Sequence, residues 1–326
     1  NIIGIDGGAT STRAVLFNDS GLTLGYAIGK GTNLNLYGKK AAYRISQIIT
    51  KLCQKTKIDI EDIDAVGLGL AAASDLDGRD LVFRELDQLK LSKRSIIMND
   101  AEAAFEIGCP GAIGLMVTVG TGVICLGKGV EGKIVRSAGR GHQNGDVGSG
   151  FWIGKQGILQ LAMNESSIAV DPELSILLDM VLDHFNTNSL NEAIELTMNN
   201  IDSVALIASL TKNIIALAKS GHEISLSIIQ KATTAVADYI LEVSDNMKLF
   251  DQKIVLAGNG SVVRNDFYRN SLNDALKFDF SDIQWTFSTL SAAYGAGILA
   301  SKLHDVNIHV PKLINGNFLD AANSKN

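Results

Sequence analysis

Near its start the chain reads Ile2-Ile3-Gly4-Ile5-Asp6-Gly7-Gly8-Ala9-Thr10-Ser11-Thr12-Arg13-Ala14-Val15-Leu16-Phe17. The isoleucines predict a first strand and residues 14–17 a second. Gly7 and Gly8 allow backbone angles that bring amide groups close to an anion, so the turn between the strands is suited to phosphate. Asp6 ends the first strand, where its carboxylate could hold Mg²⁺ through water beside a nucleotide. Hydroxyl groups in the turn add further donors: Thr10, Ser11 and Thr12.

A second strand, glycine turn and strand follow about a hundred residues later, in Gly114-Leu115-Met116-Val117-Thr118-Val119-Gly120-Thr121-Gly122-Val123-Ile124-Cys125-Leu126-Gly127. One such hairpin alone could also begin a domain that binds no ligand, and the first loop lacks the Gly-Lys-Ser or Gly-Lys-Thr ending of a Walker sequence. The repeat favours two similar domains that each contribute a hairpin to a shared cleft. This arrangement resembles the superfamily of sugar kinases, Hsp70 and actin, whose two halves hold ATP between two phosphate loops.

Composition excludes several classes of protein. With 326 residues, of which 46% are hydrophobic, the chain can bury two cores. Lys and Arg number 29 against 35 Asp and Glu, so we expect no nucleic-acid partner. The three scattered cysteines indicate reduced thiols in a cytoplasmic protein. No signal peptide is visible, and the uncharged run 111–127 is too short and glycine-rich for a membrane span.

The first domain is predicted over residues 1–113. Apolar residues at helical spacing predict an amphipathic helix over 38–56, and apolar runs predict strands over 63–70 and 95–98. A helix is expected from Ala101. The predicted order is therefore three strands, helix, strand, helix, strand and helix.

The second domain is predicted over residues 114–326. Its hairpin is followed by a glycine-dense loop at 139–150, a mostly helical insertion from 151 to about 248, and a strand at 254–257. The next loop, Gly258-Asn259-Gly260-Ser261, is expected to open a helix near Arg264 whose amides can meet a nucleotide. Small residues at 291–300 predict a helix that crosses closely over another and packs back on the first domain. Because no Pro- or Ser-rich linker separates the domains, packed helices should join them.

The run GRGHQNGDVGSGFWIG at 139–154 looks like the GDEGSGYWIG signature of the N-acetylglucosamine kinase and BadF/BadG/BcrA/BcrD ATPase family. The similarity covers essentially the entire chain. Two departures are Val147, where the family commonly has Glu, and Arg140, where many members have Trp; the second leaves acyl-group recognition open. The resemblance implies an α/β fold of two ribonuclease-H-like, actin-like ATPase domains with a central cleft.

Phosphoryl transfer to a sugar hydroxyl needs a carboxylate that accepts the hydroxyl proton. Asp100 follows a predicted strand, where open α/β sheets place ligands, and the resemblance points to it as the catalytic base. An Asp at this position could instead only cap the helix from Ala101. Asp146 could bind sugar hydroxyls or the metal, or be a turn residue. The remaining residues expected at the sugar are Thr32, Asn33, Asn99 and Gly145, and those expected at the adenosine are Gly258, Asn259 and Gly260.

The resemblance therefore implies an ATP-dependent kinase that phosphorylates the 6-hydroxyl of N-acetylglucosamine, with ATP and Mg²⁺ as ligands and a possible homodimer. Glucosamine is the nearest rival substrate. A dehydratase-activating ATPase shares the fold, but it would carry cluster-ligating cysteines. A sugar-responsive repressor would need a helix-turn-helix before the first hairpin, which we do not expect here. A chaperone or filament protein would hydrolyse ATP without a sugar acceptor.

Overall fold

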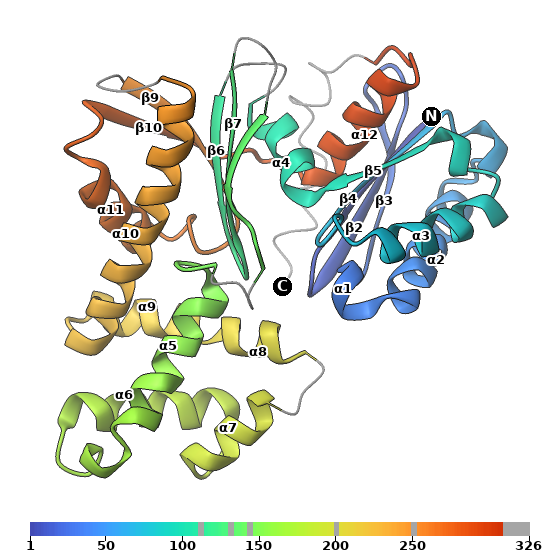
Figure 1. Ribbon diagram of the computed structural model, residues 1–326. Helices are drawn as coiled ribbons and strands as arrows, with labels where there is room; N and C mark the ends of the chain where they lie inside the picture. Colours follow the sequence, from blue (N-terminus) through green and yellow to red (C-terminus); the bar gives the residue numbers. More distant parts are fainter. Residues whose placement is uncertain (110–113, 130–133, 142–145, 199–201, 249–252, 309–326) are drawn as a thin grey trace. The chain divides into compact units, whose positions relative to one another are not determined.

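The computed structural model describes residues 1–109, 114–129, 134–141, 146–198, 202–248 and 253–308. The chain forms two compact α/β units, unit 1 (Asn1–Ala112 and Phe287–Asn326) and unit 2 (Ile113–Thr286), and each has a five-stranded sheet (Figure 1). Within the described residues no single helix is long and apolar enough to cross a membrane. One pair of helices bent by 115°, Ser203–Lys219 and Glu223–Asn246, passes that test only when taken together.

The sheet of unit 1 has the strand order β3-β2-β1-β4-β5. β1, β2 and β3 form an antiparallel meander, whereas β4 and β5 run parallel to β1. The carboxyl ends of β1, β4 and β5 therefore share one edge of the sheet, where Gly7 pairs with Leu70 and Leu70 with Asn99. The strands are Ile2–Gly7, Ser11–Phe17, Thr23–Lys30, Ala65–Leu70 and Ser95–Asn99.

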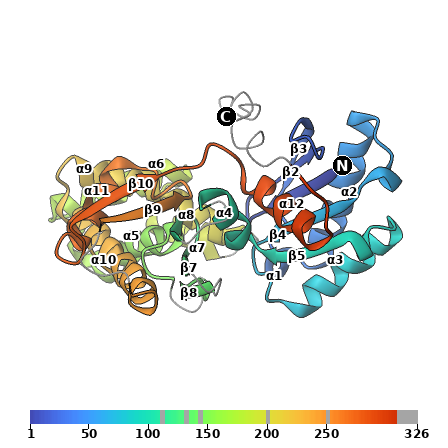
Figure 2. The same cartoon turned by 90° about the horizontal axis from the view of Figure 1, so that it is seen from above.

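Helices cover both faces of this sheet. Successive side chains of β1 point to opposite faces, and the isoleucines on each face are buried against helices. Ile3 and Ile5 pack in one core with α2 and α3, while Ile2 packs in another with α12 (Figure 2). The amphipathic helix predicted over 38–56 is confirmed as α2. The helices are α1 (Leu34–Tyr37), α2 (Lys39–Thr56), α3 (Leu76–Gln88), α4 (Asp100–Gly108) and α12 (Ala292–Leu303), with short 3-10 turns at Ile60–Asp62 and Ser92–Arg94.

The small-residue helix α12 lies directly on the backbone of its neighbours. A Cβ added at Gly4 of β1 would overlap the carbonyl oxygen of Ala293, and one at Gly67 of β4 would overlap that of Ala296. On the other side, a Cβ at Gly295 would overlap the carbonyl oxygen of Ala103 in α4. The close helix crossing predicted for this segment is confirmed.

The sheet of unit 2 has the order β10-β9-β6-β7-β8, and it repeats the plan of unit 1. β6, β7 and β8 form an antiparallel meander, and β9 and β10 run parallel to β6. The predicted repeat of the hairpin is thus part of a repeat of the whole sheet. The strands are Gly114–Val119, Val123–Lys128, Ile134–Ala138, Lys253–Asn259 and Asp282–Thr286.

Between β8 and β9 lies the predicted helical insertion. Its helices are α5 (Gly150–Met163), α6 (Pro172–Phe185), α7 (Leu190–Met198), α8 (Ser203–Ser209), α9 (Thr211–Lys219) and α10 (Glu223–Asn246), with a 3-10 turn at Glu165–Ser167. Two boundaries differ from the sequence prediction. β4 begins at Ala65 rather than Ile63, and the helix expected near Arg264 begins at Asp266 as α11 (Asp266–Leu276), because the Asn265 side chain caps it.

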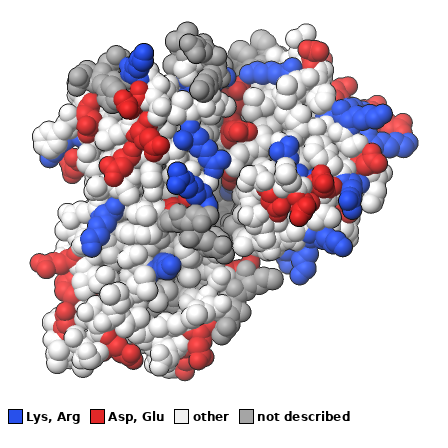
Figure 3. Space-filling view, in the orientation of Figure 1, with Lys and Arg blue, Asp and Glu red and all other residues white. Residues whose placement is uncertain are grey.

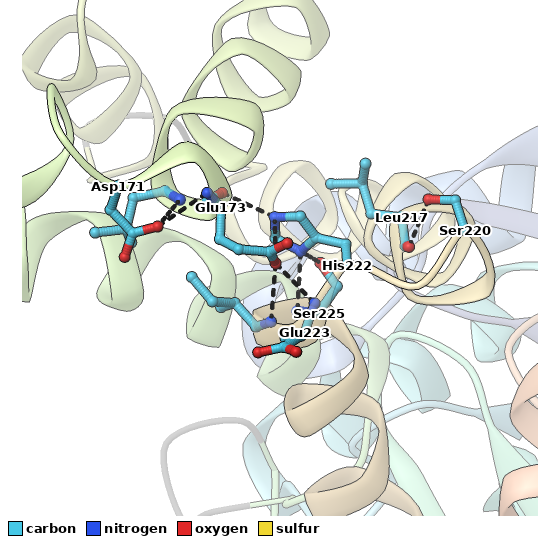
Figure 4. Close-up of polar contacts among 9 residues, drawn as sticks. Asp171, Glu173, Leu217, Ser220, His222, Glu223 and Ser225 are labelled. Atoms are coloured by element: carbon cyan, nitrogen blue, oxygen red, sulfur yellow. Dashed lines mark hydrogen bonds and ion pairs between the residues drawn. The ribbon is translucent and has the colours of Figure 1, made fainter.

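His222 joins the starts of α6 and α10 (Figure 4). Its Nδ1 accepts a hydrogen bond from the Ser225 amide at 3.2 Å, so Nε2 carries the proton and donates to the Glu173 carbonyl oxygen at 2.8 Å. The Glu173 carboxylate in turn accepts from the Glu223 amide at 2.7 Å. Two helix ends thereby satisfy each other's backbone groups inside the insertion.

Candidate active site

The first glycine turn of unit 1 is Gly8-Ala9-Thr10, closed by a hydrogen bond from the Gly8 amide to the Ser11 carbonyl oxygen at 3.0 Å. Thr10 is exposed and Ser11 is half-buried, so neither side chain is fully enclosed in the core. Thr12 is different, because its buried hydroxyl donates to the Lys30 carbonyl oxygen at 2.8 Å. The Thr12 side chain therefore supports the base of the hairpin from within unit 1.

The segment predicted to bind sugar is tied to the same turn. The amides of Thr32 and Asn33 both donate to the Gly8 carbonyl oxygen, at 2.9 and 3.1 Å. The Thr32 hydroxyl is buried and lies 2.9 Å from that of Thr12, while Asn33 Oδ1 caps α1 by accepting from the Leu36 amide at 3.1 Å. Unit 1 thus brings the two predicted segments together, with the Thr32 side chain turned inward.

Two carboxylates lie at the shared edge of the unit 1 sheet. Asp6 is on β1, and Asp100 is the first residue of α4, directly after β5. Burial, and secondly the charge of Asp100, raises the pKa of Asp6 from 3.8 to about 7. Arg13 acts in the opposite direction, with its Nη1 3.9 Å from Asp6 Oδ2. The influence of Asp100 on this pKa means that the two carboxylates are close enough to repel each other.

Gly69 of β4 makes room between these acids, and the sequence analysis did not single it out. It pairs with Asp6 in the sheet, and a Cβ there would lie 3.5 Å from the Asp100 Cα and 2.6 Å from the Ala103 Cβ. A side chain at this position would push α4 away from the sheet. The glycines that interrupt the apolar run of residues 65–70 were the available signal.

The start of α4 is capped by Asn99. Its Oδ1 accepts from the Ala101 amide at 3.0 Å, and Glu102 returns a bond by accepting from the Asn99 amide at 3.3 Å. Asp100 Oδ1 also accepts from the Ala101 amide, at 2.9 Å. The N-cap position, which was the alternative role for Asp100, therefore belongs to Asn99.

In unit 2, three segments distant in sequence meet at the end of β6. The Gly120 amide closes the second glycine turn onto the Gly122 carbonyl oxygen at 2.9 Å, as Gly8 does in unit 1. The Gly150 amide, at the start of α5, donates to the Gly120 carbonyl oxygen at 2.7 Å. The Val262 amide, just after the predicted adenosine loop, donates to the Val119 carbonyl oxygen at 3.0 Å.

The predicted adenosine loop is held against the same strand end. Asn259 Nδ2 lies 3.4 Å from Thr118 Oγ1, on the neighbouring strand. Gly260 has a φ of +92°, and a Cβ there would overlap the Val119 carbonyl oxygen, so only glycine fits. Gly258 is the residue of β9 that pairs with Val117.

Asp146 organises the glycine-dense loop from a buried position. Its Oδ1 accepts from the amides of Arg140 and Gly141, at 3.0 and 3.2 Å. Its Oδ2 would lie 3.4 Å from a Cβ at Gly122, so the carboxylate is beside the second glycine turn. Gly145, also predicted at the sugar, lies outside the described residues.

The residues of unit 1 fit a magnesium-bound nucleotide. Mg²⁺ is usually held by one or two carboxylates together with phosphates and water, and a dication would relieve the repulsion that raises the pKa of Asp6. The described residues contain no group of three or more His, Cys, Asp or Glu side chains able to hold a metal by themselves.

Comparison with known proteins identifies the family of this chain. The model of the BadF/BadG/BcrA/BcrD ATPase family matches residues 3–300. The N-acetylmuramic acid/N-acetylglucosamine kinase of Clostridium acetobutylicum is 28% identical over 306 residues, which cover 92% of this chain and 97% of the relative. The N-acetyl-D-glucosamine kinase of Dictyostelium discoideum is 29% identical over 314 residues, covering 91% and 97%.

A solved structure shares the fold over nearly its whole length. It comes from Chromobacterium violaceum and is provisionally assigned as an N-acetylglucosamine kinase. The TM-score is 0.73 at 22% sequence identity, and the match covers 91% of this chain and 98% of that one.

Proposed function

Because the chain belongs to the BadF/BadG/BcrA/BcrD ATPase family, we propose that it is an ATP-dependent amino-sugar kinase. Its substrate is N-acetylglucosamine, and the γ-phosphoryl group of ATP goes to the 6-hydroxyl. The names of the two relatives support the class of substrate. The observation that carries the proposal is that Asp6 and Asp100 share one edge of the unit 1 sheet: Asp6 pairs with Gly69, and a Cβ at Gly69 would lie 3.5 Å from the Asp100 Cα.

The two acids take different roles. Asp100 accepts the proton of the sugar hydroxyl as the hydroxyl oxygen attacks the γ-phosphorus, whose bond to the bridging oxygen breaks so that ADP leaves. The Ala101 amide, which donates to Asp100 Oδ1, orients the carboxylate. Asp6 would hold Mg²⁺ through water, and the bound metal would shield the charge of the phosphates. Gly69 keeps the space between the acids open.

The glycine turns of both units bind the nucleotide through backbone amides and short hydroxyls. In unit 1 the groups are those of Gly7, Gly8, Thr10 and Ser11, with Thr12 supporting the hairpin from below. In unit 2 the phosphate-binding residues are Gly120, Thr121 and Gly122, and the adenosine-binding residues are Gly258, Asn259 and Gly260.

The sugar is bound by short polar side chains close to these turns. Asn33 and Asn99 use Oδ1 for capping, so each would offer its amide NH₂ to sugar hydroxyls. Asp146 would accept hydroxyl hydrogen bonds through Oδ2. Thr32 contributes by holding Asn33 against the first turn rather than by its own buried hydroxyl.

A dehydratase-activating ATPase is less well supported by the cysteines. Burial raises the pKa of the Cys109 thiol to about 11 and also raises the pKa of Cys53 and Cys125, the latter being fully buried. Among the described residues, these cysteines also belong to no group of three or more side chains that could hold a metal together.

A coupled ADP-release assay tests the proposal. The purified protein is supplied with Mg·ATP and, separately, N-acetylglucosamine, glucosamine, N-acetylmannosamine, N-acetylmuramate and glucose. We expect ADP release to depend on sugar and to be fastest with an N-acetylated amino sugar, and NMR of the product should place phosphate on oxygen 6. ADP release that is equal with and without every sugar would contradict the kinase proposal.

A further inference from the structure

The first glycine turn lies in direct contact with the sugar segment, residues 31–33. A Cβ added at Gly31 would be 2.0 Å from the Ala9 carbonyl oxygen, and one at Gly7 would be 2.1 Å from Thr32 Oγ1. Neither glycine position leaves room for a side chain. Two parts of unit 1 that are distant in sequence, one proposed for the nucleotide and one for the sugar, are therefore packed against each other.

Tyr37 adds a side-chain contact to this junction. It is the last residue of α1, whose N-cap is Asn33, so one helical turn brings Tyr37 back beside the sugar segment. Its hydroxyl donates to the Ala9 carbonyl oxygen at 2.9 Å. Arg44 Cζ lies 4.5 Å from the centroid of the Tyr37 ring, and Arg44 Nη1 donates to the Gly31 carbonyl oxygen at 2.5 Å. Tyr37 and Arg44 thus form a brace that holds one carbonyl oxygen in each of the two segments.

The brace fixes the direction in which amides of the turn point. Both peptides of the turn are trans, and a trans peptide is planar with its N–H opposite to its C=O. The Ala9 carbonyl oxygen, held by Tyr37, belongs to the same peptide as the Thr10 amide. The Gly8 carbonyl oxygen, which accepts from the amides of residues 32–33, belongs to the same peptide as the Ala9 amide. The Ala9 amide is therefore directed away from the sugar segment, and the Thr10 amide away from Tyr37.

The direction of these amides matters for binding phosphate. Figure 3 shows Lys and Arg side chains interspersed with Asp and Glu over the visible face of unit 1, so this face does not attract a polyphosphate by a field of one sign. Short-range donors such as the amides of the turn are then the groups that matter. A hydrogen bond weakens steeply when its N–H···O angle falls below about 120°, so a rotation of either peptide would weaken phosphate binding.

The same peptides carry the effect of one ligand to the other. When phosphate accepts from the Ala9 amide, the peptide becomes more polarised, and its Gly8 carbonyl oxygen holds the amides of residues 32–33 more strongly. Those residues include Asn33, whose side chain is proposed to contact sugar hydroxyls. Bound ATP should therefore steady the sugar segment, and by reciprocity bound sugar should strengthen ATP binding.

We propose that Tyr37, backed by Arg44, is a positioning residue that aims the amides of the first glycine turn at ATP and couples ATP binding to sugar binding. The inference rests on the proposed kinase function. It adds two positioning residues, neither of which touches the reacting atoms, and a sign for the coupling, since each ligand favours the other.

The test measures how strongly each ligand favours the other. Calorimetry gives the Kd of N-acetylglucosamine without nucleotide and with saturating Mg·AMPPNP, an ATP analogue that resists hydrolysis. In the wild type the Kd should fall about 5-fold or more when the analogue is present. Tyr37→Phe removes only the hydroxyl and should bring this factor toward 1, a decrease of about 2-fold or more.

Two further variants complete the design. Tyr43→Phe removes a hydroxyl at an exposed position of α2, so it is the matched control and should leave the factor unchanged. Arg44→Met removes the donor to the Gly31 carbonyl oxygen and should lower the factor in the same direction even if Tyr37→Phe folds poorly. In both brace variants the KM for ATP should rise more than kcat falls, because the brace acts on binding.

A thermal melt separates positioning from a contribution to stability alone. The inference is overturned if the analogue leaves the wild-type Kd for sugar unchanged, or if Tyr37→Phe lowers the melting temperature but keeps the wild-type factor. In both cases ADP release would still depend on sugar. If the wild type neither binds sugar nor releases ADP faster in its presence, the proposed kinase function fails, and the coupling fails with it.

Discussion

At the scale of single residues, the candidate site depends on two carboxylates, Asp6 and Asp100, whose surroundings disfavour the charged form of Asp6. Asp6 is largely buried and faces the charge of Asp100, which the Arg13 guanidinium compensates only in part. Such an arrangement costs stability in the free protein, and it is typical of positions kept for a ligand. Two substitutions separate the chemical role of these acids from their structural cost.

Replacing Asp100 with Asn tests the general base. Asn keeps the size and most hydrogen bonds of Asp but cannot accept the proton, so turnover should fall about 10²–10⁴-fold. If the transition state is loose, proton removal is late and the loss falls at the low end of this range. Because Asn99 already caps α4 and the variant removes a charge that repels Asp6, the melting temperature should be no lower than that of the wild type. Steady-state kinetics and a thermal melt check both, and wild-type turnover in a normally folded variant would remove Asp100 from the mechanism.

Replacing Asp6 with Asn should change how stability depends on pH without metal. The pKa of Asp6 is about 7 in the folded protein against 3.8 ordinarily, so the folded state retains a proton that the unfolded state has lost between these values. The free energy of unfolding contributed by Asp6 therefore falls as pH rises through this window, and stays low above it. The Asp6→Asn variant should not show this fall in the free energy of unfolding, because the Asn side chain does not titrate.

Thermal melts in a chelator measure this effect. The melting temperature of Asp6→Asn relative to wild type should increase from about pH 5 to about pH 8. Turnover should show the reverse order, because the variant loses the carboxylate proposed for Mg²⁺, and raised Mg²⁺ should restore little of it. If the melting temperatures of the variant and the wild type differ by the same amount at both pH values, the pKa of Asp6 is not raised in the folded protein.

At the scale of elements, α4 is positioned by backbone contacts that only small residues permit. α12 lies against β1 and β4 at Gly4 and Gly67, and against α4 at Gly295. Lys302 of α12 also pairs with the buried Glu106 of α4. Asp100 therefore stands at the end of a helix whose distance from the sheet is set by glycines.

Gly295→Ala should disturb this packing. The new methyl group would overlap the Ala103 carbonyl oxygen, so α4 and α12 must separate, at a cost of about 1–3 kcal/mol in the free energy of unfolding. Turnover should fall as well, because α4 carries Asp100. Gly129→Ala is the matched control, since a Cβ there meets nothing within 4 Å. Denaturant unfolding that gives equal stability for the two variants would argue against the close crossing.

His222 forms a joint between the starts of α6 and α10, and this joint leads to a separate prediction for the helical insertion. His222→Ala removes the acceptor for the Ser225 amide and the donor to the Glu173 carbonyl oxygen, so it should cost about 1–2 kcal/mol of stability. His222→Asn keeps a capping side chain and should recover part of that loss. Chemical denaturation monitored by circular dichroism measures both, and an Ala variant as stable as wild type would show that the joint contributes nothing.

At the scale of the whole molecule, the two units repeat one plan. Each has a meander followed by two parallel strands, and each closes its glycine turn with an amide of that turn, from Gly8 and Gly120. A Cβ at either glycine meets no atom nearer than 3.6 Å, so a side chain there leaves the fold intact. Packing therefore does not require glycine at these two positions, whereas close approach of a ligand to the backbone would.

Gly8→Val and Gly120→Val test whether both units serve one nucleotide. Each should fold normally yet lower kcat/KM for ATP at least about 10-fold, because the side chain blocks approach of phosphate to the amides. Calorimetric binding of the sugar should change much less. If either variant is folded and keeps wild-type ATP kinetics, the turn of that unit takes no part in phosphate binding.

The sequence by itself determined the elements and the family of this protein. Both follow from local patterns, which can be recognised without knowledge of the fold. These patterns are the glycine turns between apolar runs, the helical spacing over residues 38–56 and the signature at 139–154. The sequence did not determine boundaries such as that of α11, which was expected near Arg264, because the side-chain cap at Asn265, one residue further on, decides where the helix begins.

Only the tertiary structure decided what each polar side chain does. Thr12, Thr32, Asn99 and Asp100 look alike in the sequence as short polar residues near strand ends, yet burial turns the first two inward and gives the cap to Asn99. The space at Gly69, the repulsion between Asp6 and Asp100 and the loop that fixes Arg140 arise from pairing between distant segments. Hydrogen-bond partners, burial and charge depend on neighbours in space, and the order of residues along the chain does not specify those neighbours directly.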